Sequence, residues 1–311
     1  AKWPSGFDKV AEYVKSRGMG LGLFFEPGVA MVGTQRPNEH PEFFYSYADA
    51  AGTRVYRFSD AAARAHILEL VSGFVERYDL RYIRWDHNLD AIPFIRDEDP
   101  TLKLVFAHVR GLYDVWETLL DRHPRLALES CAAGGRRLDL GSMQRSHACW
   151  CNDNMGNPHI YHVIQAGGNV FVPGYYLGAS LGWRPNMGQH PDASLSDLSF
   201  LSRMAGEFFF QGRLSDWPEE KRERARHWAD VYKRQRHLLG QEYYRLLPQP
   251  ESEADWNAFQ FCDGSAEGLV FAFRVAGETD TQRLRLRRLD GAKSYTFTDV
   301  RTGDMGNTRA G

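Results

Sequence analysis

Short apolar runs alternate with segments of helical periodicity over the first three quarters of this chain. In the helical segments apolar residues recur every three or four positions, and a capping Asp60 opens the clearest of them. The apolar runs predict strands that begin near residues 21, 81, 126, 148, 169 and 207. Because strands that alternate with helices form parallel sheets covered by helices, the pattern predicts an α/β fold. The best match is a (β/α)8 barrel of the TIM type, with its first two strands before Ala1.

The pattern changes after residue 247. Short alternating runs at 256–261, 269–275, 284–289 and 295–300 are broken by Gly, Asp and Asn, which is typical of an antiparallel β-sandwich. We therefore predict a barrel over 1–247 that carries the chemistry and is incomplete at its N-terminus, followed by a small antiparallel β-sandwich domain over 248–311. The chain opens on Ala1 and not on Met, so we interpret it as a piece of a longer protein whose sandwich is cut short at Gly311.

Composition and charge exclude several classes of partner. The 311 residues are 43% hydrophobic and 25% charged, which is typical of a globular protein, and the net charge of -2 gives no general attraction to nucleic acid or to an anionic membrane. No apolar run approaches the roughly 20 residues that span a bilayer. The sequence leaves open whether the protein forms a homo-oligomer. The compartment also stays open, and the lack of an Asn-x-Ser/Thr acceptor favours the cytoplasm only weakly.

The four cysteines predict neither a disulfide framework nor a metal site. They are few and scattered, and Cys149-x-Cys151 lacks both the two-residue gap and the distant second pair of a structural zinc site. We therefore expect no metal and no cofactor.

Polar side chains gather where two of the predicted strands end. Asp86, His87 and Asn88 follow the run 80–85, and Asp153 follows a run that ends near Trp150. Parallel barrels carry their chemistry at the C-terminal ends of their strands. Two carboxylates presented by two strand ends are the minimum equipment for glycoside hydrolysis. The long stretch 29–59 predicts a loop after the first strand that helps to shape the same site.

Three motifs together resemble the melibiase family of α-galactosidases, glycoside hydrolase family 36. They read GLGLFFEPG at 20–28, YIRWDHN at 82–88, and ESCAAGGRRLDLG at 129–141 with WCNDN at 150–154. The motifs occur in the order of the family and cover most of residues 1–245. The resemblance implies a retaining exo-glycosidase that removes terminal α-linked galactose from a small carbohydrate.

The resemblance also implies roles for single residues. Asp86 matches the nucleophile of the family and Asp153 its general acid/base. The remaining matches are to residues that bind substrate, and they fall on Arg84, Trp85, Asn88, Cys131, Gly134 and, in a looser alignment, Arg54.

Several positions depart from the family pattern. Arg84 stands where Lys is usual and His87 where an apolar residue is usual, while Gly28 closes a motif that normally ends in Glu. Ala132 and Ala133 replace Ser and Gly in the turn, which narrows the space beside the sugar. A guanidinium keeps the positive charge of Lys but offers a planar fork, so the sugar that is recognised can differ from galactose.

Other functions remain open on the sequence. Within the family these are α-N-acetylgalactosaminidase activity, another α-glycosidase activity, and transfer of galactose to a second sugar. A metal-dependent barrel hydrolase would use Asp86, His87, His147 and Asp153, and a non-catalytic relative would bind carbohydrate without turnover.

Overall fold

The structure, a computed structural model, describes residues 6–153, 156–182, 196–264 and 266–309. The chain divides into two compact units, Ala1–Trp150 and Cys151–Gly311. The domain boundary that the sequence suggests near residue 248 lies inside the second unit and stays a prediction.

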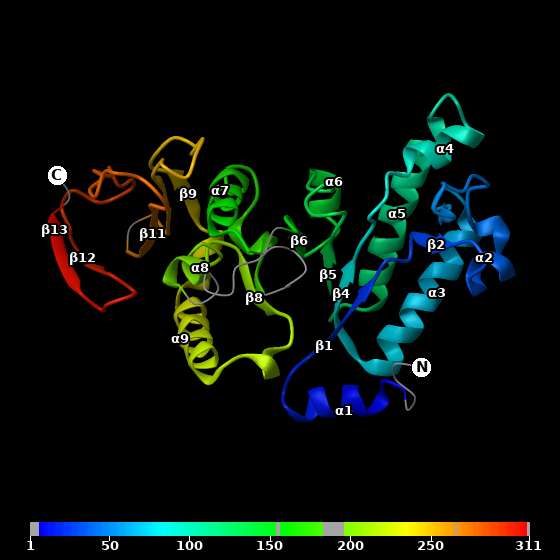
Figure 1. Cartoon of the computed structure of the whole chain (residues 1–311), viewed down its shortest axis with the longest axis horizontal. Coiled ribbons are helices and arrows are strands. Elements are labelled where there is room, and N and C mark those ends of the chain that lie inside the picture. Colours follow the sequence, from blue (N-terminus) through cyan, green and yellow to red (C-terminus); the bar gives the residue numbers. More distant parts are fainter. Residues whose placement is uncertain (1–5, 154–155, 183–195, 265, 310–311) are drawn as a thin grey trace. The chain divides into compact units, whose positions relative to one another are not determined.

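The first unit is built on four parallel strands in the order β1-β4-β5-β6 (Figure 1). Their bounds are β1 Leu21–Phe25, β4 Leu80–Trp85, β5 Ala127–Ser130 and β6 Ala148–Trp150. The helices of this unit are α1 Asp8–Ser16, α2 Gln35–Glu39, α3 Ala61–Tyr78, α4 Ile92–Glu98, α5 Lys103–Arg122 and α6 Leu140–Met143. All four strands begin within a residue of the predicted positions 21, 81, 126 and 148, so the parallel, helix-covered sheet is confirmed for this part of the chain.

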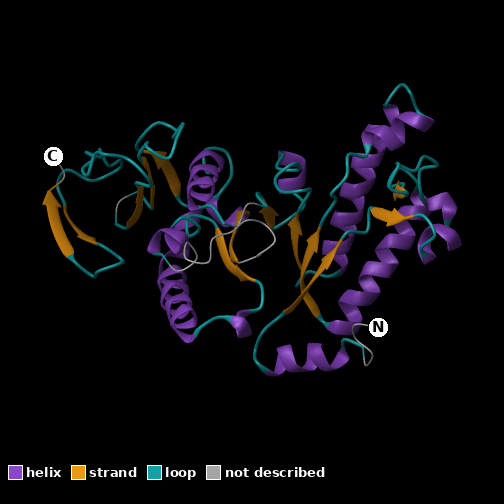
Figure 2. Ribbon diagram, in the orientation of Figure 1, coloured by secondary structure: helices purple, strands orange, loops and turns teal. Residues whose placement is uncertain are grey.

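Alternation along β4 separates a packed face from a polar one. Ile83 and Trp85 are almost fully buried in a core with α3 and α5, whereas Tyr82 and Arg84 point to the other face of the sheet. Figure 2 shows α3 and α5 lying along these strands. Helix α3 begins where the sequence predicts, because the side chain of Asp60 accepts a hydrogen bond from the backbone N–H of Ala63 at 2.9 Å.

The predicted loop 29–59 has more structure than its composition indicates. It contains the hairpin of β2 Val29–Met31 and β3 Thr53–Val55, the short helix α2, and the 3-10 turn η1 Pro41–Phe43. Its core residues Phe44, Tyr45, Val55 and Tyr56 are each at most 1% exposed. The segment therefore folds because it buries its own aromatic side chains. Its Gly and Pro residues favour a loop prediction and give no sign of this burial.

The second unit holds two further parallel strands, β7 Leu177–Gly182 and β8 Glu207–Gln211. Its helices are α7 Pro158–Gly168, α8 Asp197–Leu201 and α9 Glu219–Gln235, with 3-10 turns η2 Gly174–Tyr176, η5 Leu214–Asp216 and η6 Arg236–Gly240. The predicted strand near 169–172 is wrong, since Val170 and Phe171 are 62% and 58% exposed in the turn after α7. The strand there is β7, whose sequence LGASLG is buried at every position and has no apolar run.

The C-terminal part is antiparallel, as predicted, but it is not one sandwich among the described residues. Strands β9 Glu242–Arg245, β10 Asn257–Cys262 and β11 Gly268–Phe273 form a three-stranded sheet in the order β11-β10-β9. Strands β12 Ser294–Thr298 and β13 Met305–Arg309 form a separate hairpin. The predicted strand at 284–289 is wrong, because that segment has no ladder partner in the structure.

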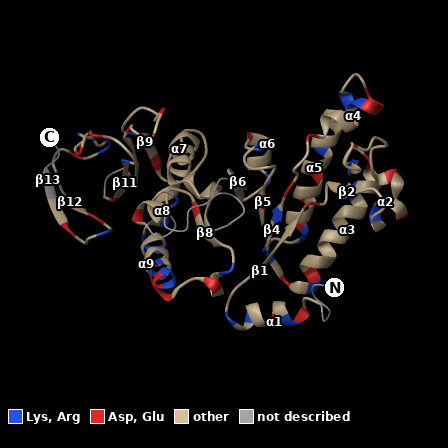
Figure 3. Ribbon diagram, viewed as in Figure 1, with Lys and Arg blue, Asp and Glu red and all other residues tan. Residues whose placement is uncertain are grey.

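The described residues thus form a mixed α/β fold with parallel strands and separate antiparallel sheets. None of the described helices is long and apolar enough to cross a bilayer. The ribbon in Figure 3 carries acidic and basic positions mixed along the chain. The predicted lack of a polyanionic partner stays a prediction.

Candidate active site

Asp86 follows β4 at the C-terminal end of the strand and is held on both its backbone and its side chain. Its backbone N–H donates to the carbonyl of Phe25 at 2.8 Å, which continues the pairing of β1 with β4 by one residue. Its Oδ1 accepts the backbone N–H of His87 at 2.7 Å. With 6% of its surface exposed, the carboxyl group of Asp86 is buried and held in a fixed orientation.

Cys131 contacts the carboxyl group of Asp86 from the next strand. Its backbone N–H donates to the carbonyl of Trp85 at 2.9 Å, and its thiol hydrogen-bonds Asp86. Burial, followed by the nearby Asp86, raises the pKa of the Cys131 thiol to about 12. The thiol therefore stays protonated and serves as a weak hydrogen-bond donor to the carboxylate.

Arg137 contacts the backbone that carries Asp86 and Cys131, and the sequence analysis did not name it as a site residue. Its Nη2 donates to the carbonyl oxygens of Cys131 and Trp85, and its guanidinium lies 5.1 Å from the ring centroid of Trp116. Burial lowers the pKa of Arg137, while the attraction of Asp86 acts against that shift. The only sequence signal for it is the pair of arginines directly after the glycine-rich turn, of which Arg136 is exposed and Arg137 is not.

The glycine-rich turn itself follows β5 and places Cys131. Gly134 has φ 82° and Ala133 has φ 47°, and the carbonyl of Gly134 accepts the N–H of Ala132 at 3.2 Å. A left-handed residue other than glycine costs roughly 1 kcal/mol, so Ala133 is a strained position. Gly134 could contact substrate only through its backbone, and this contact stays a prediction.

The predicted substrate residue Arg84 is engaged by protein groups. Its Nη2 lies 3.2 Å from Oε1 of Glu129, and its guanidinium stacks 3.5 Å from the ring centroid of Trp150. The hydroxyl of Tyr82 donates to Oε2 of the same glutamate at 2.7 Å. Burial raises the pKa of Glu129 and the charge of Arg84 opposes this rise.

Trp85 belongs to the hydrophobic core. It is 1% exposed, and its ring packs at 6.4 Å from Phe58 and 6.2 Å edge-on from Trp116. A ring in this position has no free face for a sugar to stack on. What Trp85 does for the site is accept, on its carbonyl, the bonds from Cys131 and Arg137.

Asn88 and Arg54 lie on the margins of this cluster. Asn88 is exposed, and its backbone N–H donates to Oε1 of Glu26 at 2.6 Å. Arg54 is half-buried on β3, where it pairs with Ala30 of β2. Both stay predictions as substrate contacts.

The histidines give little support to a metal centre. No group of three His, Cys, Asp or Glu side chains within the described ranges could hold a metal ion. His147 accepts the backbone N–H of Leu128 on its Nδ1 at 3.1 Å, which occupies one possible ligand atom. Burial lowers the pKa of His87 to about 4 and that of His108 to about 3.

Asp153 belongs to the second unit and follows β6 by three residues. Its side chain is exposed, while Cys151, two residues before it, donates from its thiol to the carbonyl of Gly178 at 3.1 Å. This bond fixes the start of the segment against β7. The role of Asp153 beside Asp86 stays a prediction.

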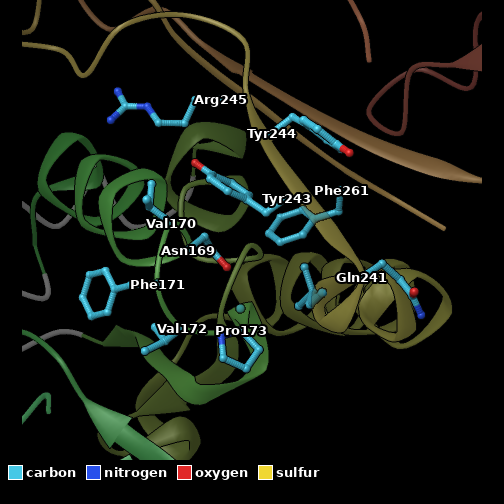
Figure 4. A pocket seen from close by; sticks show the side chains of 12 residues that line it. Asn169, Val170, Phe171, Val172, Pro173, Gln241, Tyr243, Tyr244, Arg245 and Phe261 are labelled. Atoms are coloured by element: carbon cyan, nitrogen blue, oxygen red, sulfur yellow. The ribbon is translucent and has the colours of Figure 1, made fainter. Parts of the chain in front are cut away.

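One pocket lies apart from all the predicted site residues. It has a volume of about 530 Å³ and is lined in the second unit by residues that include Asn169, Phe171 and Tyr243 (Figure 4). It adjoins η2, at the N-terminal end of β7, whereas barrel chemistry takes place at C-terminal ends. It is therefore not the candidate active site.

Comparison with known proteins adds a family to this geometry. The model of the family described as Melibiase matches residues 1–241. "Alpha-galactosidase AgaA" of Geobacillus stearothermophilus is 27% identical over 94% of this chain and 41% of that protein, and "Alpha-galactosidase 2" of Hypocrea jecorina is 25% identical over 91% and 38%. A crystal structure of an AgaA variant in complex with 1-deoxygalactonojirimycin superposes with a TM-score of 0.81 at 25% identity, over 94% of this chain and 42% of that one. The chain thus spans about two fifths of these relatives.

Proposed function

The chain belongs to the Melibiase family, and from this premise we propose that the intact protein carrying it is a retaining exo-α-galactosidase, with Asp86 as the nucleophile and Asp153 as the general acid/base. The proposal covers the whole protein, because the chain matches 41% of the relative AgaA. The relatives are named alpha-galactosidases, and one is solved with 1-deoxygalactonojirimycin.

The observation that carries the proposal is the way in which Asp86 is held. A buried carboxyl group stands at the C-terminal end of a parallel strand, between the N–H of His87 and the thiol of Cys131, with the guanidinium of Arg137 nearby. A nucleophile must present one oxygen in a fixed direction to an anomeric carbon. The backbone N–H on Oδ1 and the thiol of Cys131 hold the carboxyl group in one direction.

In the proposed first step, a carboxylate oxygen of Asp86 attacks the anomeric carbon while Asp153 gives its proton to the departing oxygen. The C–O bond to the leaving group breaks and a galactosyl ester with Asp86 forms. In the second step Asp153, now a carboxylate, takes a proton from water, whose oxygen displaces the ester. Retention requires that the two carboxyl groups come within about 5.5 Å of each other in the working enzyme.

The test is hydrolysis of p-nitrophenyl α-galactoside by the intact protein, by its Asp86→Ala variant, and by that variant with azide. Wild-type turnover, loss of at least about 10⁴-fold in Asp86→Ala, and rescue by azide with a β-galactosyl azide product are the expected results. Asp153→Ala should be rescued by azide as well, but with an α-galactosyl azide product. The galactosyl ester with Asp86 is β-configured, and azide displaces it with a second inversion, so the α-azide indicates loss of the acid/base with the nucleophile intact. A wild-type protein that is inert on every α-galactoside would refute the proposal.

A further inference from the structure

The end of β1 and the segment after β4 are joined at three consecutive points. The N–H of Asp86 bonds the carbonyl of Phe25 at 2.8 Å, and the N–H of Asn88 bonds Oε1 of Glu26 at 2.6 Å. Between these bonds the imidazole of His87 packs against Gly28. A Cβ atom at Gly28 would lie 2.8 Å from Nδ1 of His87, a separation that real Cβ contacts essentially never show.

Gly28 has no easy way to move. Its carbonyl accepts the backbone N–H of Tyr56, a fully buried residue, at 2.9 Å, and Pro27 before it is buried. Its φ is outside the left-handed region, so the backbone conformation does not demand glycine. Glycine is required at position 28 because a side chain there would collide with the imidazole of His87.

The imidazole of His87 lies among charged groups but carries no charge of its own at neutral pH. Burial is the main reason that its pKa falls to about 4, and the charge of Arg137 adds to this shift, while Asp86 and Asp90 oppose it. Its Nε2 is buried and has no hydrogen-bond partner among the described residues. Such a ring acts through its shape and not through a salt bridge.

We propose that His87 and Gly28 are a matched pair that positions Asp86: the imidazole, seated on Gly28, fixes the peptide between residues 86 and 87, whose N–H holds Oδ1 of the carboxylate. His87 is then a positioning residue and not a catalytic one. The inference rests on the proposed role of Asp86 as nucleophile. It also links two departures from the family pattern, Gly28 after β1 and His87 after β4, because a glycine where a larger residue is usual leaves room for the imidazole.

The experiment is a double-mutant cycle in the intact protein, with kcat and KM for p-nitrophenyl α-galactoside. Gly28→Ala should lower kcat about 10- to 100-fold, because a displaced imidazole turns the 86–87 peptide, and should change KM less than about threefold. His87→Ala should lower kcat about 5- to 10-fold. The double variant should match His87→Ala alone, since the added methyl group then meets no ring.

Gly73 supplies the matched control. It lies exposed on α3 with nothing within 4 Å of a Cβ atom, so Gly73→Ala should keep wild-type kcat. Azide rescue of Asp86→Ala tests the nucleophile role of Asp86 separately from the positioning role of His87 and Gly28. Wild-type activity with azide rescue but unchanged kcat in Gly28→Ala, or a double variant whose loss equals the product of the two single losses, overturns the pair alone. An inert wild type, or no azide rescue, removes the proposed function and with it the positioning role.

Discussion

Nη2 of Arg84 lies 3.2 Å from Oε1 of Glu129, and the two residues are register partners on the neighbouring parallel strands β4 and β5. The side chains are 17% and 3% exposed, so this ion pair is largely removed from water. The ring of Trp150 covers the guanidinium, and the charge of Asp86 acts on Glu129 as well.

Removing one partner of this pair should destabilise the first unit. Arg84→Leu leaves the buried Glu129 without its cation, which costs about 3 to 5 kcal/mol of unfolding free energy at neutral pH. Denaturant titration at pH 7 measures the cost. The control is Arg84→Leu with Glu129→Gln, which should recover most of the loss because no charge is then left unpaired. If the single variant unfolds at the wild-type midpoint, the ion pair contributes nothing.

The thiol of Cys131 should resist alkylation in the folded protein. It is 3% exposed and its pKa is raised to about 12, so at pH 8 almost none of it is the reactive thiolate. Iodoacetamide at pH 8 followed by peptide mass spectrometry should leave Cys131 unlabelled, while the same protein in denaturant should be labelled there fully. Rapid labelling under native conditions would contradict the burial of this thiol.

The sequence predicted the strands of the first unit well because each contains apolar residues in a short segment that lies between helical segments or turns. Strand β4 begins and ends at the predicted residues, and α3 begins at the predicted cap. It failed at β7, where both faces are buried and small residues replace branched ones, and at 169–172, where an apolar run is exposed in a turn. Periodicity records which residues are apolar and not what covers them.

The candidate site likewise has features that the sequence predicted and features that it did not. The sequence placed Asp86 and Cys131 at neighbouring strand ends, because motif order and strand ends are local properties. It could not foresee that Trp85 faces the core, that Arg137 turns inward, or that Gly28 and His87 touch. Each of these depends on contacts between residues far apart in the chain, which a single sequence does not encode in its local pattern.

Arg137 should be needed for both stability and activity. Arg137→Met leaves the carbonyl of Cys131 short of a donor and removes the positive charge near Asp86, at a cost of about 2 kcal/mol of unfolding free energy. We expect kcat of the intact protein to fall at least about 10-fold, while Arg137→Lys should recover part of the charge but not the two-carbonyl contact. Thermal unfolding and steady-state kinetics measure the two effects. Wild-type kcat in Arg137→Met would show that the charge does not act on the nucleophile.

Acid should destabilise the first unit through its buried histidines. The pKa of His87 is about 6.5 when unfolded and about 4 when folded, with Arg137, Asp86, Asp90 and His108 as the neighbouring titratable groups. Between these values the unfolded chain binds the proton that the folded chain excludes, so stability is complete above pH 6.5 and falls as the pH drops towards 4. The part due to His87 is about 3 kcal/mol.

Denaturant midpoints measured from pH 7 to pH 4 test this sign. His87→Gln carries no titrating ring, so its midpoint should decline less steeply with acid than that of the wild type, by an amount that grows as the pH approaches 4. His147→Gln is a useful comparison, because burial is what lowers the pKa of His147 and the variant should reduce the pH dependence less than His87→Gln does. Parallel pH curves for wild type and His87→Gln would mean that His87 takes up its proton at the same pH in the folded protein as in the unfolded chain, so that folding does not exclude the charged ring.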